Sequence, residues 1–232
     1  MAEQLPVNFE FRANQTFDDF YPGSNQEILA QLKKTVAGTG EQLIFIWGEK
    51  GHGKSHLLQA CCQEAFNQGV SAFYLDLSDS VTTDLELFAG LEDFELVCLD
   101  NIDSLAGRRD WELALFNFFN QHRDQNHRLI LSATCAPNSL SFTLPDLKTR
   151  INWGLSLKIQ PLDDNDKIAA LTHKAQQMGL EIAPQVARFL LTHYDRNLPS
   201  LWLILDKLDW ASLAAKRKLT IPFLKQILEQ QD

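Results

Sequence analysis

Residues 48–55 combine the residue types that a phosphate-binding loop requires. They fit the pattern G-x-x-x-x-G-K-[ST] without a gap, between an apolar run and a segment with helical character. Glycines let the backbone approach phosphates, and the start of the following helix favours negative charge. In such a loop Lys54 reaches the terminal phosphates and the Ser55 hydroxyl holds Mg²⁺. The residues expected to contact the nucleotide here are Gly48, Gly51, His52, Gly53, Lys54, Ser55 and His56.

A carboxylate that could complete this site is Asp100, which ends the apolar run 96–99. An aspartate at the end of a strand can hold the Mg²⁺ shell, although it could instead cap the next helix. The next residue, Asn101, cannot accept a proton, whereas an active ATPase needs a base to orient the attacking water. Asp103 is expected on a turn or at a helix start, out of reach of that water. We therefore expect ATP or ADP to bind and intrinsic hydrolysis to be poor.

Two more polar residues could act on a nucleotide. Ser132 ends another apolar run, where it could sense the γ-phosphate or be an ordinary serine at a strand end. Arg150 precedes the last predicted strand and could reach into the site of a neighbouring subunit. Such an arginine finger accelerates hydrolysis by about 10³–10⁵ where it operates. The alternative for Arg150 is a solvated surface arginine.

The elements that must position these residues alternate between strand and helix patterns. A helix over 54–67 follows the loop, and another carries an apolar stripe at Trp111, Leu115, Phe118 and Phe119. Nearly continuous apolar runs favour buried parallel strands with helices on both faces. The predicted strands are 42–47, 71–75, 96–100, 129–132 and 155–159.

The character of the chain changes after Pro161, where only helical periodicity remains. Prolines fall near several segment starts, where a helix tolerates them. The fold class is therefore α/β, a parallel phosphate-loop sheet with flanking helices, followed by a small all-α lid domain. The predicted lid helices are 163–178, 184–194, 198–215 and 220–230. The predicted divisions are a tail at 1–15, a nucleotide-binding domain at 16–160 and the lid at 161–232.

The net charge of −9 argues against direct, strong binding to DNA. Such binding gains most of its affinity from Lys and Arg that neutralise phosphates. The one dense basic cluster, 216–218, is typical of the cationic end of a helix. The sequence contains no run of about eighteen apolar residues, the length that would span a membrane, and its first residues lack a signal-peptide pattern. We expect a cytoplasmic protein that reaches DNA only through a partner.

The order of these parts resembles that of the AAA+ proteins related to the replication initiator DnaA. The resemblance begins with the aromatic opening TFDDFYPGSN at 16–25 and runs through the loop, Asp100, Ser132 and Arg150 to the pair Asp195-Arg196. It covers nearly the whole chain. The segments most similar to the short, Hda-like members are LVCLDNI at 96–102, LPDL at 144–147, RINWG at 150–154 and RKLTIPF at 217–223.

This resemblance implies a function. Hda-like proteins bind ADP, dock on the DNA-loaded sliding clamp and stimulate hydrolysis of the ATP held by DnaA, which prevents re-initiation of replication. The arginine finger of the family matches Arg150, and the second sensor arginine of its lid matches Arg196. The segment that lies over the base and ribose matches Phe20, Tyr21 and Asn25.

Residues 4–9, QLPVNF, resemble the clamp-binding peptide of the same family, Gln-Leu-x-[Leu/Val]-x-Phe. A short extended segment can place apolar anchors in a groove while its glutamine adds hydrogen bonds. A tail without a partner is the alternative. The residues expected to bind the clamp are Gln4, Leu5, Val7 and Phe9.

Three other functions remain open from the residues. An autonomous ATPase, such as a helicase loader, would turn over ATP by itself, against the expectation from Asn101. A small-molecule kinase would need a substrate lid with inserted arginines. An adaptor with a vestigial nucleotide site would keep full activity after Lys54→Ala. Whether copies of the chain form a homo-oligomer is also open.

Overall fold

The computed structural model describes residues 15–78, 85–215 and 220–228. Contacts divide the chain into two compact units. The first unit consists of the chain up to Phe20, Glu27–Gly48 and Gly53–Ile159. The second consists of Tyr21–Gln26, Glu49–His52 and the chain from Gln160 onward.

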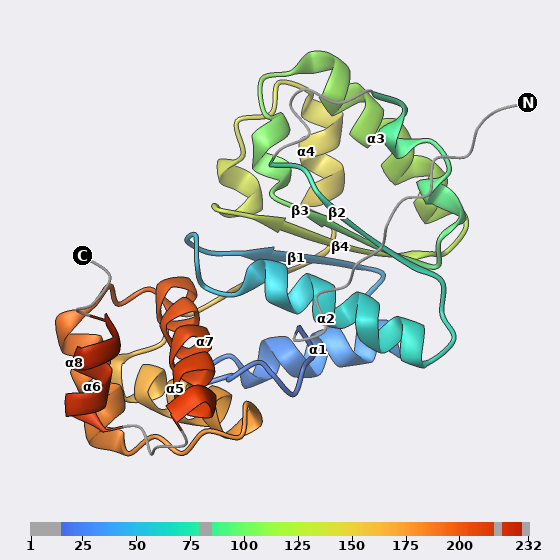
Figure 1. The fold of residues 1–232 in the computed structure, drawn as a ribbon. Coiled ribbons are helices and arrows are strands. Elements are labelled where there is room, and N and C mark those ends of the chain that lie inside the picture. The colour runs from blue at the N-terminus through green and yellow to red at the C-terminus, as the bar shows by residue number, and fades with distance from the viewer. Residues whose placement is uncertain (1–14, 79–84, 216–219, 229–232) are drawn as a thin grey trace, which may run out of the picture. The chain divides into compact units, whose positions relative to one another are not determined.

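The first unit is built on a five-stranded sheet in which every pairing is parallel (Figure 1). The strand order is β2-β3-β4-β1-β5. The register sets Asp76 beside Asp100, so the last residues of β2 and β3 bring two carboxylates together. On the other side of β4, Ser132 pairs with Ile46 of β1. The strands are β1 (Leu43–Trp47), β2 (Ala72–Asp76), β3 (Leu96–Asp100), β4 (Arg128–Ala133) and β5 (Leu155–Lys158).

Helices cover both faces of this sheet, as Figure 1 shows. One face carries α1 (Gln26–Val36) and α2 (Lys54–Asn67), and the other carries α3 (Arg109–Asp124) and α4 (Pro145–Ile151). Short 3₁₀ helices connect them: η2 (Leu85–Phe88), η3 (Leu91–Asp93), η4 (Ile102–Leu105) and η5 (Pro137–Ser139).

The apolar strand runs feed two cores, one on each face. In β1, Phe45 joins the core under α3 and α4, whereas Ile44 and Ile46 join the core under α1 and α2. This alternation follows from the two-residue period of a strand. Because both faces are covered by helices, the strand shows no alternation of polar and apolar residues.

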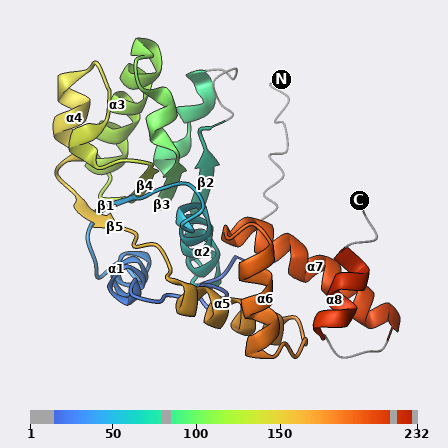
Figure 2. The ribbon, with the colours of Figure 1, turned by 90° about the vertical axis from the view of Figure 1, so that its left-hand side faces the viewer.

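The described part of the second unit includes four helices, visible in Figure 2. The carboxylate of Asp163 caps the first of them by accepting from the Asp166 N–H at 2.8 Å. Leucines from all four helices form its core, among them Leu171, Leu190, Leu205 and Leu224. The helices are α5 (Asp164–Gln177), α6 (Pro184–His193), α7 (Leu198–Ala215) and α8 (Ile221–Leu228).

The predicted fold class is confirmed, and each predicted strand lies within about two residues of an observed one. The four predicted lid helices are also present, the last of them described only to Leu228. Helix α4 was not predicted, because its seven residues are too few to show a helical period. Within the described ranges, no helix is both long and apolar enough to cross a membrane.

His122 in α3 gives the first unit a predicted sensitivity to acid. Burial lowers the pKa of His122 to about 4, and the neutral ring bonds the Phe94 carbonyl at 3.0 Å and packs on Phe118 and His127. The unfolded chain takes up this proton near pH 6.5, before the folded chain does. The free energy of unfolding should therefore fall by about 2–3 kcal/mol as the pH drops from about 6.5 to 4.

Chemical denaturation of wild type and His122→Gln across this pH range tests the prediction. Glutamine keeps a hydrogen-bond donor but does not titrate, so the variant should lose less stability on acidification. Equal slopes of stability against pH in the two proteins would show that His122 does not contribute.

Candidate functional site

The loop that follows β1 requires glycine at its last turn before α2. Gly53 has φ +92°, and a Cβ there would lie 2.7 Å from Cε2 of Phe20. The Phe20 ring meets the His56 ring edge-on at 5.4 Å, and His56 Nε2 lies 2.8 Å from the Thr16 carbonyl oxygen. Three residues predicted to contact nucleotide, Phe20, Gly53 and His56, are thus brought together.

Lys54, the lysine of the loop pattern, begins α2 and is 5% exposed. Its Nζ donates to the Gly48 carbonyl at 2.7 Å. Burial lowers the pKa of Lys54, and the carboxylates of Asp100 and Asp103 oppose that shift. Ser55 follows in the first turn of the helix and is half-buried. A buried ammonium beside a glycine loop is suited to a phosphate.

Asp100 is fully buried at the end of β3, and hydroxyl groups bond both of its carboxylate oxygens. Tyr74 donates to Oδ2 at 2.9 Å, and Ser132 donates to Oδ1. Ser132 also accepts from the Asn101 N–H at 3.1 Å. Burial, reinforced by Asp100, raises the pKa of Tyr74 far above its ordinary value, so its hydroxyl remains a donor. These contacts fix the orientation of the carboxylate.

Asn101 occupies the position where a base would be expected, and its side chain is already bonded. Its backbone is left-handed, with φ 57°, and its Nδ2 donates to Asp76 Oδ1 at 2.9 Å. Asp76 ends β2, next to Asp100 in the sheet register. Neither Tyr74 nor Asp76 was predicted from the sequence to belong to the site. The strand 71–75 was predicted, but only the pairing of β2 with β3 reveals what its end can touch.

Asp103 lies in η4, and its charge acts on Lys54, so it belongs to the same polar cluster. Its Oδ2 accepts from the N–H of Thr134 at 3.2 Å and from the hydroxyl of that residue. Its Oδ1 is buried and bonds no described residue. An unbonded buried carboxylate oxygen in the cluster around Lys54 and Asp100 is compatible with a cationic ligand. The residues present therefore fit a nucleotide with Mg²⁺, which Ser55 and Asp100 would hold.

Tyr74→Phe tests whether this cluster holds a metal–nucleotide group. The variant removes one hydrogen bond to Asp100, and loss of a group that bonds and orients a metal-holding carboxylate lowers metal affinity by about tenfold or more. We expect nucleotide affinity in the presence of Mg²⁺ to fall about tenfold, as measured by isothermal titration. The same titration in EDTA is the control, where the two proteins should bind alike. An equal loss with and without Mg²⁺ would contradict a role through Asp100.

Arg150 lies near the end of α4, on the same unit. Its guanidinium carbon lies 4.4 Å from the ring centroid of Trp153 and 5.9 Å from that of Phe116 in α3. The start of α4 is held by the buried carboxylate of Glu112, which accepts from the N–H groups of Thr143, at 2.7 Å, and Leu144, at 2.8 Å. Burial favours a raised pKa for Glu112, but these hydrogen bonds outweigh it and lower the pKa.

The remaining predicted residues lie in the second unit or outside the described residues. Asn25 is 2% exposed, and its side-chain amide exchanges two hydrogen bonds with the backbone of Gln160, at 3.0 and 2.8 Å. Arg196 donates from Nε to the Leu191 carbonyl at 3.1 Å and pairs with Asp164 at 3.7 Å. Tyr21, Gly51 and His52 also belong to this unit. Gln4, Leu5, Val7 and Phe9, which are predicted to bind the clamp, lie outside the described residues.

A parallel sheet of this order, with a phosphate loop after β1 and an all-α lid, defines the class of the protein as AAA+. Sequence profiles refine this class. The profile of the bacterial DnaA ATPase domain matches residues 11–158, and that of the Hda lid domain matches residues 164–228. The chain belongs to the DnaA ATPase-domain family, in the DnaA-related form that carries the lid of Hda.

Solved structures agree with this fold. DnaA from Aquifex aeolicus, bound to AMPPCP, is 24% identical with a TM-score of 0.74; the match covers 85% of this chain and 65% of that one. Domain III of DnaA from Thermotoga maritima is 21% identical with a TM-score of 0.77, over 94% of this chain and 97% of that one. The RuvB branch-migration motor of Thermotoga maritima is 16% identical with a TM-score of 0.69, over 95% and 73%.

Proposed function

We propose that this protein is a regulator of replication initiation that binds ADP or ATP with Mg²⁺ through the residues around Lys54 and Asp100. The support is the buried lysine at a glycine loop, the oriented carboxylate and the fold shared with an AMPPCP-bound DnaA. Bound Mg²⁺ would neutralise phosphate charge there. The Phe20 ring, beside Gly53, is suited to packing against the nucleotide.

The regulator acts on a second protein: together with the DNA-loaded sliding clamp, it stimulates hydrolysis of the ATP held by DnaA. One observation carries this step. The chain places Asn101, bonded to Asp76, where its own hydrolysis would need a base. A site that binds nucleotide without a base is suited to assembly, and Arg150 can supply the positive charge that a transition state on DnaA needs.

The partners follow from the same role. Gln4, Leu5, Val7 and Phe9 would dock on the clamp as an extended peptide, so the protein would reach DNA through the clamp and not by its own acidic surface. Conversion of DnaA to its ADP form after replication begins would prevent re-initiation. The protein would act in the cytoplasm.

A reconstitution by omission tests the proposal. DnaA loaded with labelled ATP is mixed with DNA-loaded clamp and this protein, and the fraction of label present as ADP is followed over time. Hydrolysis should accelerate only when both the protein and the loaded clamp are present. Gln4→Ala combined with Phe9→Ala should abolish the acceleration even when loaded clamp is present. Acceleration that is equally fast without clamp would contradict the proposed assembly.

A further inference from the structure

The guanidinium of Arg150 is held by aromatic rings. Its Cζ lies 4.4 Å from the Trp153 ring centroid, and among the described residues no carboxylate pairs with it. Contact with rings in place of a carboxylate affects how many N–H donors an arginine can offer to a phosphate. A carboxylate would occupy two of its N–H donors, whereas a ring face contacts the cation and leaves its in-plane donors available.

The backbone on both sides of Trp153 is anchored. Its N–H donates to the Arg150 carbonyl at 3.1 Å, which continues the turn of α4. The next residue, Gly154, packs so tightly on β1 that an added Cβ would lie 2.4 Å from Leu43 Cγ and 2.6 Å from the Leu43 carbonyl oxygen. The indole therefore projects from a firmly placed stretch of chain.

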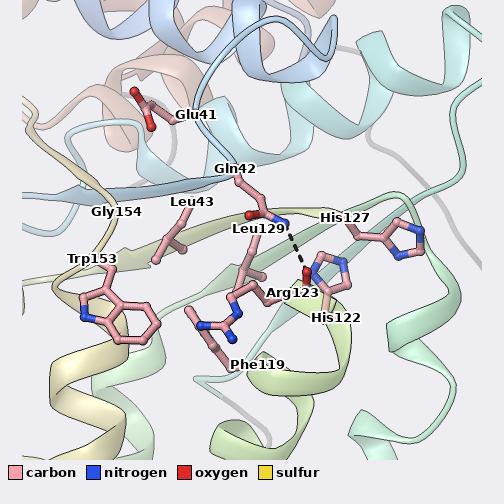
Figure 3. A pocket seen from close by; sticks show the side chains of 10 residues that line it. All are labelled: Glu41, Gln42, Leu43, Phe119, His122, Arg123, His127, Leu129, Trp153 and Gly154. Atoms are coloured by element: carbon pink, nitrogen blue, oxygen red, sulfur yellow. Dashed lines mark hydrogen bonds between the residues drawn. The ribbon is translucent and has the colours of Figure 1, made fainter. Parts of the chain in front are cut away.

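The indole itself has few packing neighbours. It is 56% exposed and forms one wall of a cavity of about 200 Å³, which Figure 3 shows together with Arg123 and Gln42. A second cation contacts the ring, since Arg123 Cζ of α3 lies 5.3 Å from its centroid. An exposed tryptophan that faces two guanidinium groups contributes more to their placement than to the core.

We propose that Trp153 is a positioning residue for Arg150, keeping the guanidinium extended from α4 and clear of carboxylates until it meets the nucleotide on DnaA. This inference rests on the proposed function. Trp153 acts through Arg150 and has no contact with the reacting atoms. Its loss lets the arginine sample many rotamers, so a smaller fraction of encounters places the cation correctly.

The test compares Trp153→Ala and Trp153→Phe with wild type in the hydrolysis of DnaA-bound ATP. The rate is measured against the concentration of this protein, which separates the maximal rate from the half-saturating concentration. We expect Trp153→Ala to lower the maximal rate about three- to tenfold, the range of a partly exposed cation–π contact. Half-saturation should change less than about twofold, and Trp153→Phe should restore most of the rate.

A second tryptophan provides a matched control. Trp210 in α7 is 82% exposed, and Trp210→Ala should retain the wild-type rate. The inference is overturned if Trp153→Ala keeps the full maximal rate, if it changes only half-saturation, or if Trp210→Ala is equally impaired. Each of these results leaves the proposed function standing, provided that Arg150→Ala is inactive.

A spectroscopic measurement separates the two proposals. The Arg150 Nε–H resonance, identified by its disappearance in Arg150→Lys, should show an upfield ring-current shift that Trp153→Ala abolishes. If wild type shows this shift but does not stimulate DnaA, the proposed function fails while the geometry stands. If the shift is absent from wild type, the positioning role of Trp153 is overturned.

Discussion

Arg150→Ala is expected to bind nucleotide as wild type does and to lose at least about 10³-fold in stimulated hydrolysis of DnaA-bound ATP. The reason is electrostatic, because an arginine that meets the transferring phosphoryl group stabilises charge that develops only in the transition state. Binding should be unaffected, since the contacts described for Arg150 are with Trp153 and Phe116 and not with the residues around Lys54. The measurement is the single-turnover rate beside a nucleotide titration.

Two variants of the same helix serve as controls. Lys148→Ala removes a positive charge two residues earlier in α4 and should retain most of the stimulation. Arg150→Lys keeps the charge but loses the forked donors, so it should recover only part of the rate. A full rate in Arg150→Ala would mean that another residue supplies the cation. An equal loss in Lys148→Ala would point to general electrostatic attraction between the two proteins.

Lys54→Ala carries the second large effect, a loss of nucleotide affinity of about 10²-fold or more. Each charge-assisted hydrogen bond contributes about 1.5–3 kcal/mol, and an ammonium in this loop would make two to phosphate oxygens. The lysine is buried, and its hydrogen bond to the Gly48 carbonyl already fixes its side chain. Binding therefore costs little additional side-chain entropy. Isothermal titration with ADP and with ATP measures the change.

Lys50→Ala is the matched control, because it removes an exposed lysine from the same loop and should change affinity little. Thermal melting should accompany both titrations, since Lys54 also faces the carboxylates of Asp100 and Asp103. Unchanged affinity in folded Lys54→Ala would contradict the predicted site. Lost affinity with retained stimulation of DnaA would instead favour an adaptor whose nucleotide site is vestigial.

The fold was largely predictable because its signals are local. The apolar run 96–99 and the helical stripe from Trp111 to Phe119 each specify an element without reference to the rest of the chain. The order of the strands is not local in this sense. Tyr74 and Asp76 become neighbours of Asp100 and Asn101 only because β2 pairs with β3.

The surroundings of Arg150 show the same limit. Arg150 was a candidate from its place before the last predicted strand and from the resemblance, but the rings that hold it come from α3 and from the turn after α4. Glu112 lies one residue after Trp111, outside the apolar stripe that the sequence shows. The structure buries it completely, because the segment that enters α4 supplies backbone donors to its carboxylate. A sequence pattern does not reveal such a partner about thirty residues away.

The most direct measurement establishes whose ATP is hydrolysed. DnaA is loaded with α-labelled ATP, this protein is loaded with unlabelled ADP, and DNA-loaded clamp is added in a single-turnover experiment. The same preparation of the isolated protein is then assayed for steady turnover of ATP. Rapid conversion of the label on DnaA, with negligible turnover by the isolated protein, is the predicted result. Steady turnover by the isolated protein, with no change in the label on DnaA, would contradict action on a partner and identify an autonomous ATPase.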